Sequence, residues 1–167
     1  MTAINGSSIS KAYGAQQTKQ QVLRNVSLSV PEGAVAVITG RSGSGKSTLL
    51  NILAGLDQPD SGSINICGTE IGDKDQEFLA RFRLKNIGLI FQFFNFLPTL
   101  SLRENVALPA YLAGEKKRVA STRAEALLGQ VGIDSQMLRL PQDVSGGGLQ
   151  RAAIARALIN KASIILA

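Results

Sequence analysis

The sequence contains no histidine and only one cysteine among its 167 residues. Because Cys67 has no partner for an internal disulfide, the chain suits a reducing compartment, and we expect this side chain to pack in the interior. No apolar run approaches the roughly 20 residues that a membrane-spanning helix requires. Residues 1–8 lack the basic start and apolar stretch of a signal peptide. These shortages argue against a secreted, disulfide-linked protein and against a membrane-spanning one.

The composition is otherwise that of an ordinary globular domain, with 44% apolar residues. Lysine and arginine number 18 against 12 acidic residues, which suits an anionic partner such as a nucleotide, a nucleic acid or a membrane surface. The positive charges are scattered, and we interpret the one run, at 116–118, as a solvated helix face rather than a nucleic-acid patch. With neither a repeat nor a long linker, residues 1–167 are expected to form a single domain.

Hydrophobic patterning predicts strands that alternate with helices, which is typical of a layered α/β domain with a helical insert. Partial alternation predicts a half-exposed strand at 22–30, and the apolar run at 34–38 predicts a strand buried on both faces. The helical stretch from about 101 to 160 is expected to break at Pro109, at Pro141 and at the glycines 146–148. The remaining predictions are helices at 48–54 and about 74–86, and strands at 63–67, 87–91 and 164–167.

A loop rich in glycine and serine follows the predicted strand at 34–38 and opens the predicted helix. It matches the pattern G-x-x-x-x-G-K-[ST] in full, with Gly40, Arg41, Ser42, Gly43, Ser44, Gly45, Lys46 and Ser47. Glycines let successive backbone N–H groups face phosphate oxygens, and the helix N-terminus adds partial positive charge. We expect Lys46 to reach the β- and γ-phosphates, Ser47 to ligate Mg²⁺, and Thr48 to complete the nucleotide-binding set. The alternative is a glycine-rich turn with an exposed lysine.

Two later stretches narrow the class of nucleotide-binding protein. They are F-Q-F-F-N-F-L-P-T-L at 91–100 and V-S-G-G-G-L-Q-R at 144–151. With the phosphate loop, they resemble the nucleotide-binding domain of ABC transporters, and most closely its lipoprotein-release and macrolide-export group. The resemblance extends from about residue 9 to 167. It implies a P-loop NTPase of the ABC type, with a three-layer α/β core, an antiparallel β subdomain and a helical subdomain at roughly 93–147.

The resemblance also assigns roles to two residues outside the loop. Tyr13 stands where the family carries the aromatic side chain that stacks on adenine, although a single tyrosine can equally be a packing residue. Gln92 matches the family's glutamine at a strand end, which contacts Mg²⁺ and the attacking water and is therefore our catalytic and metal-binding candidate. The alternative for Gln92 is a strand-end side chain in solvent.

Ser145, Gly146 and Gly147 match the family signature, which closes on the nucleotide held by a second domain in a head-to-tail pair. Here the sequence departs from the family, because Gly148 and Leu149 stand where Glu or Gln and then Gln are usual. A glycine in the first helical turn costs about 1 kcal/mol relative to alanine, and the acidic charge that favours a helix N-terminus is absent. We expect a weakened contact with the γ-phosphate.

Three aromatic residues, Phe93, Phe94 and Phe96, follow the glutamine within four positions. They cannot all face one core, so the family's groove for a short helix of the transmembrane subunit is the favoured interpretation over core packing.

In the family, the strand after the signature ends in a Mg²⁺-holding Asp, a catalytic Glu follows, and a switch His lies farther on. Residues 164–167 correspond to that strand, and no acidic residue follows Asp143. We therefore expect the 167 residues to be truncated just before this Asp, with the last part of the sheet missing. General-base activation contributes about 10²–10⁴-fold, so we expect ATP binding with poor hydrolysis, and a turnover near 1 s⁻¹ would contradict this expectation.

The leading hypothesis is an ATP-binding subunit that couples ATP binding and hydrolysis to export or extraction of a substrate. The resemblance implies ATP and Mg²⁺ as ligands, and a transmembrane permease and a second nucleotide-binding domain as partners. It places the chain on the cytoplasmic face of the inner membrane and implies no nucleic-acid partner. A non-catalytic remnant that only binds nucleotide is the alternative. A soluble ABC ATPase of DNA repair or translation is disfavoured by the chain's length.

Overall fold

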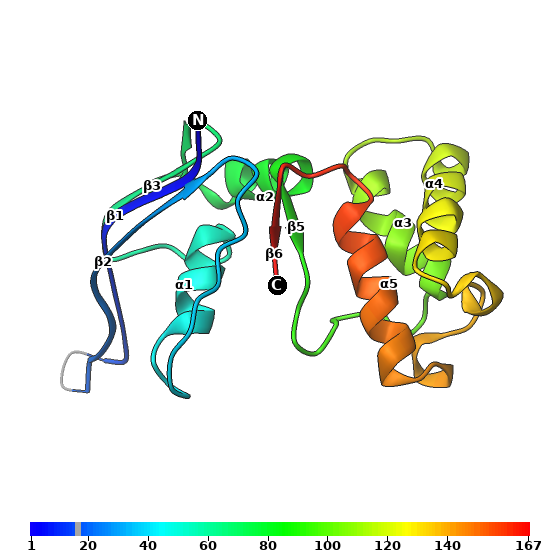
Figure 1. The fold of residues 1–167 in the computed structure, drawn as a ribbon, viewed down its shortest axis with the longest axis horizontal. Coiled ribbons are helices and arrows are strands. Elements are labelled where there is room, and N and C mark those ends of the chain that lie inside the picture. The colour runs from blue at the N-terminus through cyan, green and yellow to red at the C-terminus, as the bar shows by residue number, and fades with distance from the viewer. Residues whose placement is uncertain (16–17) are drawn as a thin grey trace. The chain divides into compact units, whose positions relative to one another are not determined.

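An antiparallel sheet of order β2-β1-β3-β4 forms the framework of the first of two units, Met1–Ala80 and Arg81–Ala167. This computed structural model describes residues 1–15 and 18–167 (Figure 1). The strands are β1 (Thr2–Tyr13), β2 (Gln20–Pro31), β3 (Ser61–Ile66) and β4 (Thr69–Glu70), and the unit also holds α1 (Lys46–Leu53). Helix α2 (Gln76–Asn86) runs across the boundary of the units. None of the described helices is long and apolar enough to span a membrane.

Strand β2 confirms the prediction at 22–30, because its half-buried residues alternate with exposed serines in Val26-Ser27-Leu28-Ser29-Val30. Strand β1 was not predicted. Its buried residues Ile4 and Ile9 are an odd number of positions apart, which hides the alternation of a strand. The pairing with β2 shifts register between Gly6 and Ile9, and such a bulge returns the second isoleucine to the buried face.

The predicted buried strand at 34–38 is wrong. The segment forms no strand, and Val35 and Val37 are 93% and 80% exposed. A strand is buried on both faces only when it has hydrogen-bonded neighbours, and none of the described strands pairs with these residues. An apolar run therefore predicts a buried strand only where neighbouring strands are present to pair with it.

Cys67 is exposed, contrary to the expectation of interior packing. It occupies the turn between β3 and β4 together with Gly68, and their φ angles are 49° and 79°. Positive φ at both central residues is what a tight two-residue hairpin turn requires. This turn directs the side chain away from the core.

A short parallel pair, β5 (Ile87–Leu89) and β6 (Ile164–Leu166), joins the beginning and end of the second unit. Ile87 pairs with Ile164 and Leu89 with Leu166, which confirms the strands predicted at 87–91 and 164–167, although the first is shorter. Gly88 allows β5 to lie close to the helix at 146–158, because a Cβ there would collide with the carbonyl oxygen of Ala157.

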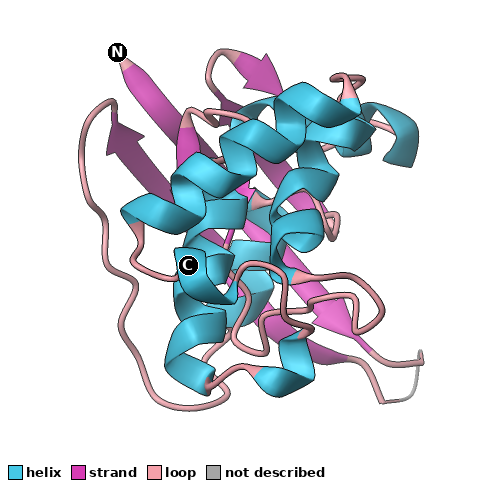
Figure 2. Cartoon of the chain, turned by 90° about the vertical axis from the view of Figure 1, so that its right-hand side faces the viewer, coloured by secondary structure: helices cyan, strands magenta, loops and turns pink. Residues whose placement is uncertain are grey.

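Helices α3 (Leu102–Leu112), α4 (Lys117–Gln130) and α5 (Gly146–Leu158) lie side by side in the second unit, as labelled in Figure 1 and seen from its right-hand side in Figure 2. Two short 3-10 helices, η1 (Asp134–Gln136) and η2 (Pro141–Asp143), join α4 to α5. The three helices share one hydrophobic core, formed by Leu102, Val106, Ala107, Ala110, Ala120, Ala124, Leu128, Ile133, Ala152, Ala155 and Ile159. The subdomain bounds expected from the sequence, 93–147, stay a prediction.

Two expected breaks in this helical region are absent from the structure. Pro109 lies inside α3, which continues to Leu112. A proline in a helix interior costs about 3 kcal/mol. In α3 this cost is offset by the burial of one helix face and by a capping box of Ser101 and Glu104 at its start. The glycines at 146–148 form the first turn of α5 and do not interrupt a helix. Pro141, at the first position of η2, does interrupt the helical pattern as predicted.

Candidate functional site

The loop at 40–47 is wrapped around the ammonium group of its own lysine. Lys46 Nζ donates hydrogen bonds to the carbonyl oxygens of Gly40 and Arg41, each at 2.9 Å. Gly45 has φ 90°, and a Cβ there would lie 2.8 Å from Leu23 Cδ2, so both its conformation and its packing require glycine. The curled loop thus brings one full positive charge to the start of α1.

Helix α1 offers its first N–H groups to an anion. Gly45 is its N-cap, and among the described residues no side chain caps it and no acidic residue stands in its first turn. The first N–H groups of a helix lack intrahelical partners, and the helix dipole adds positive potential there. Ser47 is exposed at this end, and Thr48 is half-buried. The arrangement is chemically suited to phosphate oxygens.

Tyr13, the last residue of β1, is hydrogen-bonded to a carboxylate of the first unit. Its hydroxyl donates to Asp57 Oδ2 at 2.5 Å, and Lys11 Nζ donates to Asp57 Oδ1 at 2.7 Å. The hydrogen bond to Asp57 raises the pKa of Tyr13, whereas a hydrogen bond with Thr48 of α1 lowers it by less. Burial opposes the charge of Asp57, but the bonds from Lys11 and Tyr13 outweigh it and lower the pKa of that carboxyl. The structure therefore links Tyr13 to the helix of the phosphate loop.

Gln92 is exposed in the second unit and follows β5 after two residues. The backbone turns sharply just beyond it, since Phe94 and Asn95 have φ of 57° and 50°. Arg156 of α5 donates to the carbonyl oxygens of both residues, at 2.9 Å to Asn95. Burial lowers the pKa of this arginine. The sequence did not predict that Arg156 supports the turn after Gln92. The available signal was its position as an arginine on a largely apolar helix face.

Asn105 of α3 holds the rest of the loop after Gln92. This side chain is 1% exposed; its Oδ1 accepts from Leu97 N at 2.8 Å. Its Nδ2 donates to the carbonyl oxygens of Leu97, Leu100 and Ser101 at 2.9–3.1 Å. The sequence reasoning missed this role too, because an asparagine inside a helix gives no signal of which loop it will contact.

The segment at 145–147 begins α5 as expected. Ser145 is the N-cap, and its hydroxyl accepts from the Gly148 N–H at 3.3 Å. Gly148 is buried, and a Cβ there would lie 2.5 Å from Val144 Cγ1. Leu149 is partly buried against the helical core. The two residues that depart from the family pattern are thus accommodated by packing, while Gly146 and Gly147 stay exposed.

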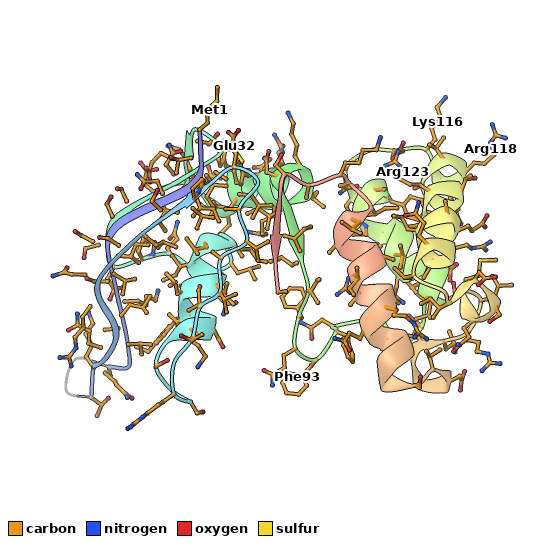
Figure 3. The ribbon with its side chains drawn as sticks, viewed as in Figure 1. Met1, Glu32, Phe93, Lys116, Arg118 and Arg123 are labelled. Carbon is orange, nitrogen blue, oxygen red and sulfur yellow. The ribbon has the colours of Figure 1, made fainter. Side chains whose placement is uncertain are left out.

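The three aromatic residues differ in exposure, and the groove for a helix of the transmembrane subunit stays a prediction. Phe93 is 82% exposed and projects from the ribbon, whereas Phe94 and Phe96 are half-buried with ring centroids 6.4 Å apart (Figure 3). The basic residues at the start of α4 are exposed, and Lys116 and Arg118 point outward in the same view.

The predicted site residues fall in both units. The phosphate loop, Thr48 and Tyr13 belong to the first, and Gln92 and residues 145–147 belong to the second. The lysine-centred loop between the sheet and α1 is that of a P-loop nucleotide-binding protein.

The model of a family described as "ABC transporter" matches residues 23–167. The chain belongs to this family. Two solved dimeric structures of the ATP-binding cassette MJ0796, one of them in a post-hydrolysis state bound to ADP and Pi, match with a TM-score of 0.91. At 36–37% identity they cover 97% of this chain and 72% of theirs, which confirms the predicted ABC-type ATPase fold.

Among curated relatives, the lipoprotein-releasing system ATP-binding protein LolD of Bacteroides fragilis is 43% identical over 95% of this chain and 72% of its own length. The macrolide export ATP-binding/permease protein MacB 1 of Aeromonas hydrophila is 44% identical over 96% of this chain and 25% of its own length. These two proteins represent the lipoprotein-release and macrolide-export group, so the predicted resemblance to that group is confirmed.

Proposed function

We propose that this chain is the ATP-binding subunit of an export or extraction system. The observation that carries the proposal is the loop that curls around Lys46 at the uncapped start of α1. A chain of net charge +6 that presents N–H groups and an ammonium at one helix end is suited to a polyphosphate. The family membership makes ATP the nucleotide of choice.

The side chains divide the work of binding. Lys46 and the backbone N–H groups of 42–47 hold the phosphates, Tyr13 stacks on the base, and Ser47 with Gln92 supplies oxygen ligands for Mg²⁺. A hydroxyl and an amide oxygen are hard ligands that suit this ion, which uses phosphate oxygens and water for its remaining positions. Bound Mg²⁺ neutralises charge on the phosphates. Ser145 and the exposed Gly146 and Gly147 approach the nucleotide of a second copy.

The proposed partners are a permease and a second nucleotide-binding domain, on the cytoplasmic face of the inner membrane. The names of MacB 1 and of the pyoverdine export protein PvdT of Pseudomonas putida describe ATP-binding/permease proteins, and MJ0796 is a dimer. The exposed ring of Phe93, beside Gln92, is an apolar contact for a permease helix. No nucleic-acid partner is proposed.

Calorimetric titration with Mg·ATP tests the proposal. Lys46→Ala removes the charge-assisted bonds to the phosphates, and we expect the affinity to fall about 10- to 100-fold. Lys117→Ala, at an exposed lysine of α4, is the matched control and should bind as the parent chain does. A folded parent chain that binds no ATP at millimolar concentration would contradict the proposal. Phosphate release, measured on the same samples, distinguishes binding with turnover from binding alone.

A further inference from the structure

The residue that holds Tyr13 in place is Asp57, in the turn that follows α1. One carboxylate oxygen accepts from the Tyr13 hydroxyl, and the other accepts from Lys11 Nζ and from the Gln58 N–H at 2.7 Å. Lys11 also donates to the Gln58 carbonyl at 2.6 Å. The Lys11 side chain is only 12% exposed and the Asp57 side chain 28%, so these contacts form a partly shielded network.

The network covers the tyrosine ring only in part. Lys11 Nζ lies over the ring, 5.2 Å from its centroid, while Tyr13 as a whole is 43% exposed. A cation against one face of an aromatic ring is favourable and occupies that face. The other face is then the one available for stacking, and the hydroxyl bond to Asp57 restricts rotation of the side chain.

We propose that Asp57 is a positioning residue that fixes the Tyr13 ring as a preorganised platform for the nucleotide base. The proposal rests on the proposed function, in which Tyr13 stacks on the base. Immobilising one side chain before binding removes an entropy cost that corresponds to roughly 2- to 10-fold in affinity. Asp57 therefore raises the affinity for the base and leaves the affinity for the phosphates unchanged.

The experiment compares two probes on the full chain: Mg·ATP, which carries base and phosphates, and Mg·tripolyphosphate, which carries phosphates alone. We expect Asp57→Ala to weaken ATP binding roughly 2- to 10-fold without changing tripolyphosphate binding, and Asp57→Asn, which keeps a hydrogen-bonding group, to restore part of the loss. Asp60→Ala is the matched control, since Asp60 is a nearby acid that binds the Ala12 N–H and Lys19 but not Tyr13.

Tyr13→Phe should weaken ATP binding as Asp57→Ala does, and the double variant should lose no more than either single one. A spectroscopic readout is available because the chain has only two tyrosines and no tryptophan. In a Tyr111→Phe background, the alkaline absorbance change reports Tyr13 alone. Asp57→Ala removes the hydrogen bond that raises the pKa of Tyr13, so the transition should move to lower pH.

Each contrary outcome has a distinct meaning. If Tyr13→Ala weakens ATP binding but Asp57→Ala does not, the positioning role is wrong and the proposed base contact stands. If Tyr13→Ala leaves ATP binding unchanged, the base contact fails and this inference fails with it. If Asp57→Ala weakens ATP and tripolyphosphate binding equally, Asp57 only maintains the fold, which overturns the inference.

Discussion

The guanidinium carbon of Arg156 lies 4.6 Å from the centroid of the Phe96 ring. From this position the same group donates hydrogen bonds to the carbonyl oxygens of Phe94 and Asn95. Both carbonyls belong to the left-handed turn that follows Gln92, while Arg156 belongs to the helix that begins at the family signature. One half-buried side chain thus contacts two of the segments that carry the resemblance to the family.

Replacing this arginine tests the connection. Arg156→Lys keeps the charge but loses the planar fork that serves two carbonyls and a ring, and we expect a loss of about 1–3 kcal/mol in the free energy of unfolding. Urea denaturation measures it, and faster hydrogen exchange at Asn95–Leu97 should accompany it. Arg151→Lys, at an exposed position of the same helix, is the control. Equal stability of the two variants would show that the contacts of Arg156 are dispensable.

Replacing Asn105 is expected to lower the free energy of unfolding by more than replacing Arg156. Asn105→Ala leaves the Leu97 N–H without its acceptor and takes one donor from each of three carbonyl groups, of which those of Leu97 and Ser101 keep a backbone partner. Unsatisfied buried groups cost about 1–3 kcal/mol each when water cannot reach them. We expect a total loss of about 2–4 kcal/mol, because water reaches part of the opened loop. Thermal unfolding followed by circular dichroism measures it. Asn51→Ala, on the exposed face of α1, should change stability by less than about 0.5 kcal/mol.

Gly147 and Gly148 form a matched pair for the signature helix. A Cβ at Gly147 meets nothing within 4 Å, so Gly147→Ala should stabilise α5 by up to about 1 kcal/mol. At Gly148 a Cβ would press on Val144 Cγ1, and overpacking of this kind costs about 1–3 kcal/mol. We expect Gly148→Ala to be the less stable variant in urea, and Val144→Ala to relieve the difference. Equal stabilities of Gly147→Ala and Gly148→Ala would show that the Val144 side chain moves aside at no cost in free energy.

The capping box of α3 predicts a dependence on pH. Hydrogen bonds from the Ser101 hydroxyl and backbone N–H lower the pKa of Glu104. A carboxyl whose pKa is lower in the folded chain stabilises it above the unfolded value of about 4.3, and this contribution is lost as the pH falls through the folded value. The stability difference between the parent chain and Glu104→Gln should therefore be largest near pH 7 and shrink below about pH 4. Urea midpoints across this range measure it, and a constant difference would contradict the prediction.

Local chemistry made several features predictable from the sequence. The phosphate loop has its glycines at positions such as Gly45, where a backbone conformation and a close approach both exclude a side chain. Strand β2 was predictable because its alternation is uninterrupted over residues 26–30. Strand β6 was predictable because Ile164 and Leu166 are buried in a short apolar run. In each case the signal lies within a few consecutive residues.

Other features depended on contacts between residues that are distant in the chain. The bulge that brings Ile4 and Ile9 to one face of β1 appears only in the pairing with β2. Residues 34–38 are apolar, but hydrogen-bonded neighbours decide whether they form a strand. Pro109 was expected to end a helix, yet its place inside α3 follows from the burial of that helix.

By itself, the sequence determined the conformation of the loop around Lys46, because this lysine and the glycines before it act through local backbone geometry. Only the tertiary structure decided which side chains bond to Tyr13 and to the turn after Gln92. Asp57 is 44 residues from Tyr13, and Arg156 is more than 60 residues from the loop that it holds. Such partners are brought together by the folding of whole units, and no pattern of neighbouring residues specifies them.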